Sequence, residues 1–154
     1  MENMIMKRIR IITSAVSAVL ILGFVIFLVL SWKNIPETVG THFNAAGEAD
    51  AFGSKRSLIM EPVLMVIFTL ILSLVERFPS LWNMPVRLTP ENRDRQLLIA
   101  SLMLGIMKIL VVLLLADAGL SSIFPGFPVW PMYLLLILTG VTVVGGIIAS
   151  IKFR

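Results

Sequence analysis

The chain has no cysteine, one histidine and one tyrosine, and only 14% of its 154 residues are charged. The absence of cysteine excludes disulfides, thiolate catalysis and zinc sites built on cysteine. The scarcity of charge goes with 58% hydrophobic residues and a mean hydropathy of +0.97, which are values of a membrane protein. The net charge of +4 would suggest nucleic acid in a soluble protein, but here the basic residues lie at the ends of apolar runs. We therefore expect no direct nucleic-acid binding.

Four apolar runs are long enough to cross a bilayer as helices, which takes about 20 residues. We expect them at residues 11–32, 57–76, 96–117 and 131–151. The first run is too long for a signal-peptide core, and no small-residue cleavage site follows it, so an uncleaved span is expected. The sequence thus predicts an all-α integral membrane protein, a four-transmembrane-helix bundle in a single domain over residues 1–154.

The distribution of lysine and arginine predicts the orientation of these spans. With four crossings, nine of the thirteen basic residues fall on one side and three on the other, and Lys108 lies inside the third span. Loops rich in lysine and arginine stay in the cytoplasm. We expect both termini to be cytoplasmic and the protein to be a multi-pass component of the cell membrane.

A long polar loop, Pro36 to Lys55, connects the first two spans and is predicted to face outward. Loops of this length are generally functional or disordered, and its apolar residues Val39, Phe43 and Phe52 favour an ordered, packed structure. The segment from Asp50 to Gly53 has the residue preferences of a type I turn.

Five side chains of this loop are candidates for ligand binding at the outer surface. Four lie within nine residues of one another, and one histidine with two acids is only a weak pattern for zinc. The alternative is that they bind the loop's own backbone, two in Asx-type turns and the histidine through a carbonyl. The five candidates are His42, Asn44, Glu48, Asp50 and Lys55.

Nothing in the sequence favours catalysis. Hydroxyl groups at Thr41, Ser54 and Ser57 lie near His42, but neither a nucleophile elbow nor metalloprotease spacing accompanies them. We expect a protein without enzymatic activity, bound metal or cofactor.

Lys108 is the most costly residue to place in lipid, where a charge costs at least about 2.5–3.5 kcal/mol. Counting along the two antiparallel helices, the sequence predicts an ion pair with Glu61. Asp117 would lie on the opposite face of the same helix. The pair could fix the helix register, Lys108 could extend to the membrane surface, or the two residues could form a relay for protons or ions.

On the cytoplasmic side, Arg87 and Arg93 are candidates for binding a protein partner or anionic membrane lipids. The simpler interpretation is that they only set the topology.

The loop reading IPETVGTHFNAAGEADAFGSK resembles that of a bacterial membrane family catalogued only as a domain of unknown function. This family is best known from the SdpI-type immunity protein of the sporulation-delaying toxin. Residues 83–96 and the following helix with Lys108 also look like short members of the family. The loop positions that match are Pro36, His42, Phe43, Asn44, Gly47, Asp50, Gly53 and Lys55.

The resemblance implies a small inner-membrane protein that protects against, or senses, an extracellular peptide. A cytoplasmic repressor held at the membrane would be a second partner. The expected function is therefore toxin immunity or signal sensing without catalysis. A small transporter or transporter subunit that uses Glu61 and Lys108 is the alternative, and a metal-dependent membrane enzyme is a third possibility. The sequence does not decide the oligomeric state.

Overall fold

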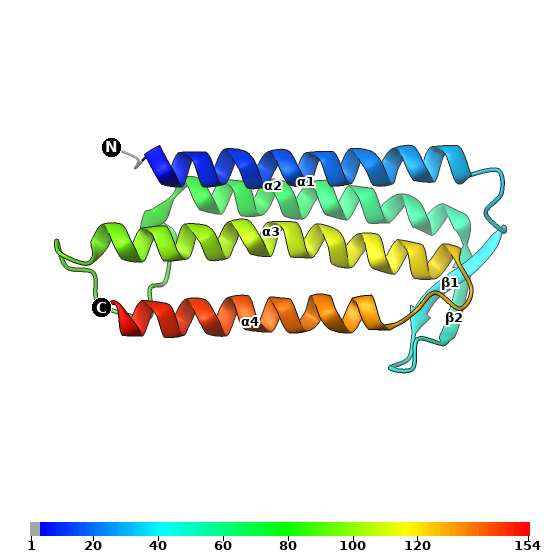
Figure 1. The fold of residues 1–154 in the computed structure, drawn as a ribbon. Helices are drawn as coiled ribbons and strands as arrows, with labels where there is room; N and C mark the ends of the chain where they lie inside the picture. Colours follow the sequence, from blue (N-terminus) through cyan, green and yellow to red (C-terminus); the bar gives the residue numbers. More distant parts are fainter. Residues whose placement is uncertain (1–3) are drawn as a thin grey trace.

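The computed structural model describes residues 4–154 and contains four long helices that run side by side (Figure 1). They are α1 (Met4–Ser31), α2 (Met60–Arg77), α3 (Arg93–Ile123) and α4 (Trp130–Lys152). Each covers one of the expected spans and is long and apolar enough to cross a membrane. The predicted four-helix membrane fold is confirmed.

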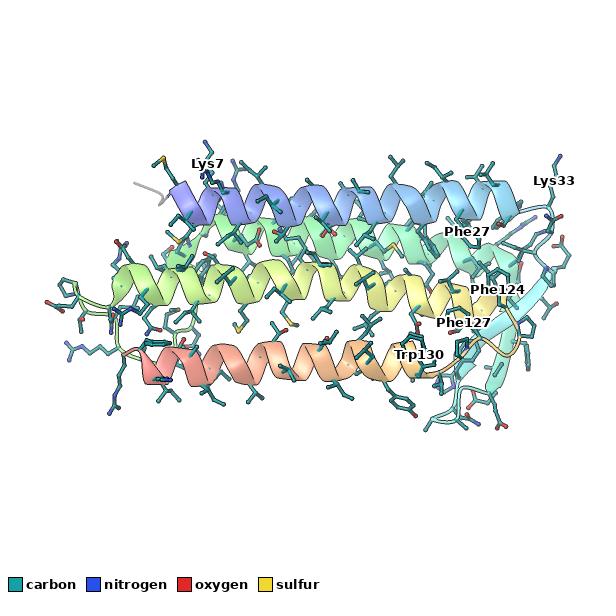
Figure 2. The ribbon with its side chains drawn as sticks, in the orientation of Figure 1. Lys7, Phe27, Lys33, Phe124, Phe127 and Trp130 are labelled. Atoms are coloured by element: carbon teal, nitrogen blue, oxygen red, sulfur yellow. The ribbon has the colours of Figure 1, made fainter. Side chains whose placement is uncertain are left out.

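The start of α1 and the end of α4 lie at one end of the bundle, and the loop between α1 and α2 lies at the other (Figure 1). We call these the terminal end and the hairpin end. The aromatic residues Phe124, Phe127 and Trp130, which connect α3 to α4, gather at the hairpin end (Figure 2). Lys7 and Lys33 mark the two ends of α1 in the same view.

Helices α1, α2 and α3 form the packed centre of the bundle, and α4 is attached to α3. On α1 the buried residues are Met6, Ser17, Phe24 and Leu28, whose intervals of 11, 7 and 4 residues place them on one helix face. On α4 only Ser150 is buried. Most of the surface of α4 is therefore available to lipid.

The polar loop is ordered, as expected, but it contains a β-hairpin that the sequence did not indicate. Strand β1 (Thr38–Phe43) pairs antiparallel with β2 (Ala49–Ser54). The turn predicted at Asp50 to Gly53 is wrong, because those residues lie inside β2. The chain reverses instead at Asn44 to Gly47, where Gly47 has a φ of 81° and donates its N–H to the Asn44 carbonyl at 2.9 Å. A glycine tolerates this conformation without a steric penalty.

The hairpin is packed onto the bundle. Ile35, Val39 and Leu58, the last of these in the 3₁₀ helix η1 (Lys55–Ile59), are 4%, 3% and 2% exposed. They join an apolar cluster with residues of three helices: Phe24, Leu28, Met65, Val112 and Ile123. The hairpin end of the bundle therefore has a continuous apolar core that includes the loop.

The connection from α2 to α3 folds over the terminal end. It contains the short 3₁₀ helix η2 (Pro79–Leu81), and the Trp82 indole N–H donates to the Val75 carbonyl at 2.9 Å. Before α3, the Thr89 N–H donates to the Asn92 side chain at 2.9 Å, and the Asn92 side chain donates to the Arg87 carbonyl at 3.1 Å. These bonds fix the segment that leads into α3.

Candidate functional site

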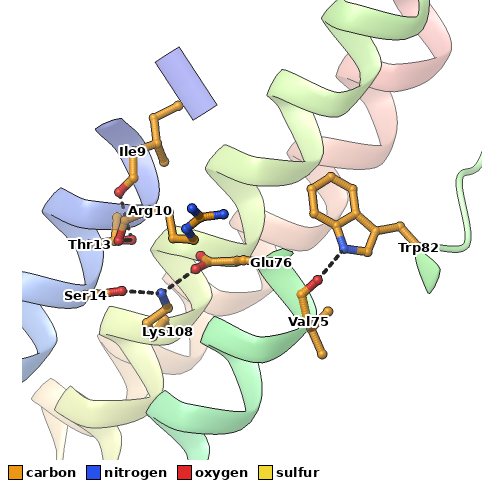
Figure 3. A network of polar contacts seen from close by, with 8 residues as sticks. All are labelled: Ile9, Arg10, Thr13, Ser14, Val75, Glu76, Trp82 and Lys108. Carbon is orange, nitrogen blue, oxygen red and sulfur yellow. Dashed lines mark hydrogen bonds and ion pairs between the residues drawn. The ribbon is translucent and has the colours of Figure 1, made fainter. Parts of the chain in front are cut away.

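An ion pair is buried among α1, α2 and α3 near the terminal end (Figure 3). The Lys108 Nζ lies 2.5 Å from Oε2 of Glu76 and donates to the Ser14 hydroxyl at 3.0 Å. The two charged side chains are 0% and 4% exposed. A buried pair of this kind avoids the cost of an isolated charge, and each partner depends on the other.

The expected pair of Lys108 with Glu61 is therefore corrected, because Glu76 takes that place. The Cγ of Glu61 lies 3.5 Å from the position that a Cβ would occupy at Gly119. Gly119 is eleven residues beyond Lys108, about 16 Å along the helix axis. The heights estimated by counting residues along the helices were wrong because α3 has 31 residues and is longer than one membrane thickness. The ends of α3 were therefore placed incorrectly relative to those of α2.

A signal for Glu76 was present in the sequence. Helical side chains lean toward the N-terminus of their own helix, so Lys108 extends toward the terminal end of the bundle, where α2 finishes. Glu76 is in the last turn of α2, and its carboxylate is within reach from there. No sequence pattern predicts the hydrogen bond from Lys108 to Ser14, because that bond depends on the rotation of α1 relative to α3.

A cavity of about 450 Å³ lies beside this ion pair, between the ends of α1, α2 and α3 and the segment that contains η2. One wall is apolar and includes Met6, Phe78 and Leu97. The charged and hydroxyl-bearing residues of its lining are Arg10, Glu76, Arg77, Ser80, Arg93, Asp94 and Ser101. Glu76 thus contacts both the buried lysine and this polar space.

Several buried oxygen atoms of the bundle interior have no hydrogen-bond partner within residues 4–154. They include Oε1 of Glu76, the Ser17 hydroxyl and the Thr69 hydroxyl, and Oε2 of Glu61 lies further toward the hairpin end. Buried polar atoms of this kind are usually satisfied by water or a ligand. The bundle interior therefore has polar groups at the ion pair and further toward the hairpin, where Phe24, Met65 and Val112 belong to the apolar cluster.

At the hairpin, four of the five candidate residues pair with one another. His42 Nδ1 contacts Oδ1 of Asp50, and Asn44 Nδ2 donates to Oε2 of Glu48 at 3.0 Å. The Asn44 Oδ1 accepts the N–H groups of Ala46 and Glu48 at 2.9 and 3.0 Å, which is the Asx-type turn expected for Asn44. The expected bond of His42 to a carbonyl is replaced by its contact with Asp50.

Lys55, the fifth candidate, is the first residue of η1 and binds the segment between α1 and β1. Its Nζ donates to the carbonyls of Trp32 and Ile35, each at 3.3 Å, and lies 2.9 Å from Oε1 of Glu37. The same ammonium lies 5.4 Å from the centroid of the Trp32 ring. A cation next to the carbonyls that follow a helix is favourable because that end of the helix is partly negative.

The hairpin tip is also attached to α4. The Tyr133 hydroxyl contacts the Ala45 carbonyl, and a Cβ at Gly47 would lie 3.1 Å from the Cβ of Val129. The hairpin therefore contacts the centre of the bundle through Val39 and α4 through its tip, and Lys55, directly after β2, binds the segment that follows α1.

Of the two cytoplasmic candidates, Arg93 lines the cavity beside Glu76, whereas Arg87 is exposed in the preceding segment. Among the residues that the structure describes, no group of three or more His, Cys, Asp or Glu side chains is placed to hold a metal ion.

Comparison with known proteins matches residues 18–66 to a family described as "Domain of unknown function (DUF1648)". This segment covers the second half of α1, the hairpin, η1 and the start of α2. An uncharacterized protein of Archaeoglobus fulgidus is 35% identical over 68 residues, which are 39% of this chain and 37% of the relative. The chain thus matches well under half of that relative's length. No solved structure matches the chain.

Proposed function

We propose that the protein is a cell-membrane receptor for an extracellular peptide and acts in toxin immunity or signal sensing without catalysis. In this proposal the termini are cytoplasmic and the hairpin faces outward, as the distribution of lysine and arginine favours. The observation that carries it is the attachment of the hairpin to α3 and α4, together with the bonds from Lys55, next to the hairpin, to the segment that follows α1. A peptide bound to the hairpin would change contacts with two helices and with this segment at once.

The shape of the hairpin favours an extended peptide as its ligand. Among residues 4–154, strand β2 pairs only with β1, and most of its residues are exposed. The other edge of β2 therefore offers backbone donors and acceptors to a further strand, a common mode of peptide recognition. The exposed pair His42 and Asp50 lies on this hairpin and would add polar contacts.

The match of residues 18–66 to the family also supports this proposal, because the matched segment is the hairpin with its flanking helices. The SdpI-type immunity protein, which the loop resembles, provides the precedent for a peptide toxin as ligand. A cytoplasmic repressor would be the partner at the terminal end, where Arg87 is exposed.

Orientation is tested first. Since the chain has no native cysteine, single cysteines can be placed at Ala46, in the hairpin tip, and at Arg87. A membrane-impermeant maleimide should label position 46 in intact cells and position 87 only after the cells are opened. The reverse pattern would put the hairpin in the cytoplasm and end the receptor proposal.

Ligand binding is tested with peptides secreted by the producing organism, added to the purified protein in detergent. The His42→Ala and Asp50→Ala variants should each lose binding. Lys33→Ala is the matched control, because Lys33 is exposed at the same end of the molecule but outside the hairpin (Figure 2). Equal binding by all three variants would exclude the hairpin as the recognition surface.

A second candidate function, transport, is favoured by the buried pair of Lys108 and Glu76 next to the cavity. Ionisable residues inside a membrane often mark ion or proton pathways. Proteoliposomes with a pH-sensitive dye inside should then show proton flux under an imposed potential. The double variant Lys108→Leu with Glu76→Leu, which removes both charges together, should abolish the flux, and Lys33→Gln should retain it. Absence of flux with the unmodified protein would eliminate this candidate for protons.

A further inference from the structure

The cavity at the terminal end has the shape of a site for a small amphipathic group. Its volume is about 450 Å³, and it is formed by three helices and the η2 segment. Met6, Phe78 and Leu97 give it an apolar side. Trp82 is a further wall residue, and its ring is held by the indole hydrogen bond to the Val75 carbonyl at 2.9 Å (Figure 3).

The charges in the cavity favour an anion. Arg10, Arg77 and Arg93 line it together with the carboxylates of Glu76 and Asp94, and the charge of Glu76 is already balanced by Lys108. Within the described part of the chain, neither the Arg77 nor the Arg93 side chain makes a hydrogen bond or ion pair. Two guanidinium groups are therefore available, and their planar donor sets match phosphate oxygens.

The position of Arg93 adds to this preference. Arg93 is the first residue of α3, where the partial positive charge of the helix makes a second positive charge unfavourable. The N-cap residue Asn92 makes no side-chain hydrogen bond to the helix. The carboxylate of Asp94, in the first turn of α3, compensates only part of the positive charge of Arg93 and the helix end. An anion in the cavity would balance both Arg93 and the end of the helix.

The Glu76 side chain, only 4% exposed, requires a second property of the ligand. Its Oε2 binds Lys108, but its Oε1 is buried and has no partner within residues 4–154. A carboxylate oxygen accepts hydrogen bonds and would repel a bare phosphate oxygen. A hydroxyl group on the ligand would satisfy it.

We propose that this cavity binds a phosphate ester that carries hydroxyl groups, with the phosphate at Arg77 and Arg93 and a hydroxyl at Glu76. Glycerol phosphate has this chemistry, either as the headgroup of phosphatidylglycerol or as a free solute. The apolar wall and the place of the cavity at the end of the spans suit both the headgroup and the start of its chains. The proposal is independent of peptide recognition, because the cavity is lined by the starts of α1 and α3 and the end of α2. The hairpin lies at the opposite end of the bundle (Figure 1).

Native mass spectrometry of the purified protein in detergent tests the site directly. The protein is titrated with phosphatidylglycerol, with phosphatidylcholine of the same chains, with free glycerol phosphate and with inorganic phosphate. The cavity variant is Arg77→Gln with Arg93→Gln. The matched control is Arg8→Gln with Arg154→Gln, two exposed arginines outside the cavity lining, which removes the same charge. Circular dichroism confirms that each variant keeps its helices.

The expected result is a preference for phosphatidylglycerol over phosphatidylcholine that falls about 10-fold or more in the cavity variant and stays in the control. Binding of free glycerol phosphate above inorganic phosphate, lost in the same variant, would assign the site to a soluble ligand of the same chemistry. An equal loss in both double variants, or no preference among the four compounds, would overturn the proposal.

Discussion

The two halves of the bundle interior are built in different ways. Toward the hairpin, Phe24, Leu28, Met65 and Val112 form an apolar core that includes residues of the loop. Toward the chain termini, the same helices enclose an ion pair, the Ser14 hydroxyl and a cavity with charged walls. The apolar half has the features of a fixed support for the hairpin, and the polar half those of a site.

The two halves also differ in the interactions that hold them together. Lipid is as apolar as leucine, so the apolar half is held by close packing more than by exclusion of water. The polar half is held by interactions that fail if one partner is removed, because an unpaired charge cannot remain buried at low cost. Substitutions should therefore act differently on the two sides of the level of Lys108.

The largest effect is expected at the ion pair. Glu76→Ala should destabilise the protein by about 3–5 kcal/mol, because it leaves the buried Lys108 ammonium without its counter-ion. Thermal unfolding in detergent, followed by size-exclusion chromatography, measures the loss. Exchange of the two charges, Glu76→Lys with Lys108→Glu, should recover part of it. The exchange Glu61→Lys with Lys108→Glu should recover no stability. Recovery in that variant would support the ion pair of Lys108 with Glu61 that the sequence predicted.

In the apolar half, Met65→Ala should cost about 2 kcal/mol or more, since Met65 is 0% exposed and its removal leaves a void. Val66→Ala is the matched control on the same helix, because Val66 is 43% exposed and faces away from the core. Its effect should stay below about 0.5 kcal/mol. Equal stability of the two variants would mean that the apolar half is loosely packed.

Close approach of α1 and α3 gives a smaller effect. A Cβ at Gly119 would lie 2.5 Å from Cζ of Phe24, so Gly119→Ala should cost about 1–2 kcal/mol. A Cβ at Gly145 on α4 would have no atom within 4 Å apart from the adjacent backbone of its own helix. Gly145→Ala should therefore be neutral or slightly stabilising. The same thermal assay compares the two. A larger loss at Gly145 would indicate that α4 is covered by something other than lipid.

The smallest effect is expected where the hairpin tip meets α4. Tyr133→Phe removes the hydroxyl that contacts the Ala45 carbonyl and should cost about 1 kcal/mol or less. Amide hydrogen exchange should become faster at residues 45–47 and stay unchanged around Leu58, which is anchored in the apolar half. Unchanged exchange at the tip would show that α4 does not hold the hairpin in place.

Sequence reasoning located the elements of the site better than their contacts. It identified Lys108 as the buried charge, and the structure confirms its burial, because an isolated lysine in an apolar run must find a partner. It chose Glu61 as the partner and missed Glu76 and Ser14, because the choice depended on helix ends and rotations that no local pattern specifies. The cavity was not predicted at all, since Arg10, Arg77 and Arg93 come from three separate helices.

The same division applies to the hairpin. The Asx-type turn at Asn44 was predictable because it uses only neighbouring backbone groups. The strands were not, because their pairing joins residues sixteen positions apart, such as Thr38 and Ser54. The contact of Tyr133 with Ala45 crosses 88 positions and lies beyond any local rule.

By itself, the sequence determined that four helices span the membrane and that an ordered polar loop joins the first two, because length, hydropathy and turn residues act locally. Only the tertiary structure decided which carboxylate neutralises Lys108, how the loop pairs into strands, and that three arginines surround one cavity. Those features depend on the relative rotation and offset of the helices, which close packing sets and a one-dimensional pattern does not contain.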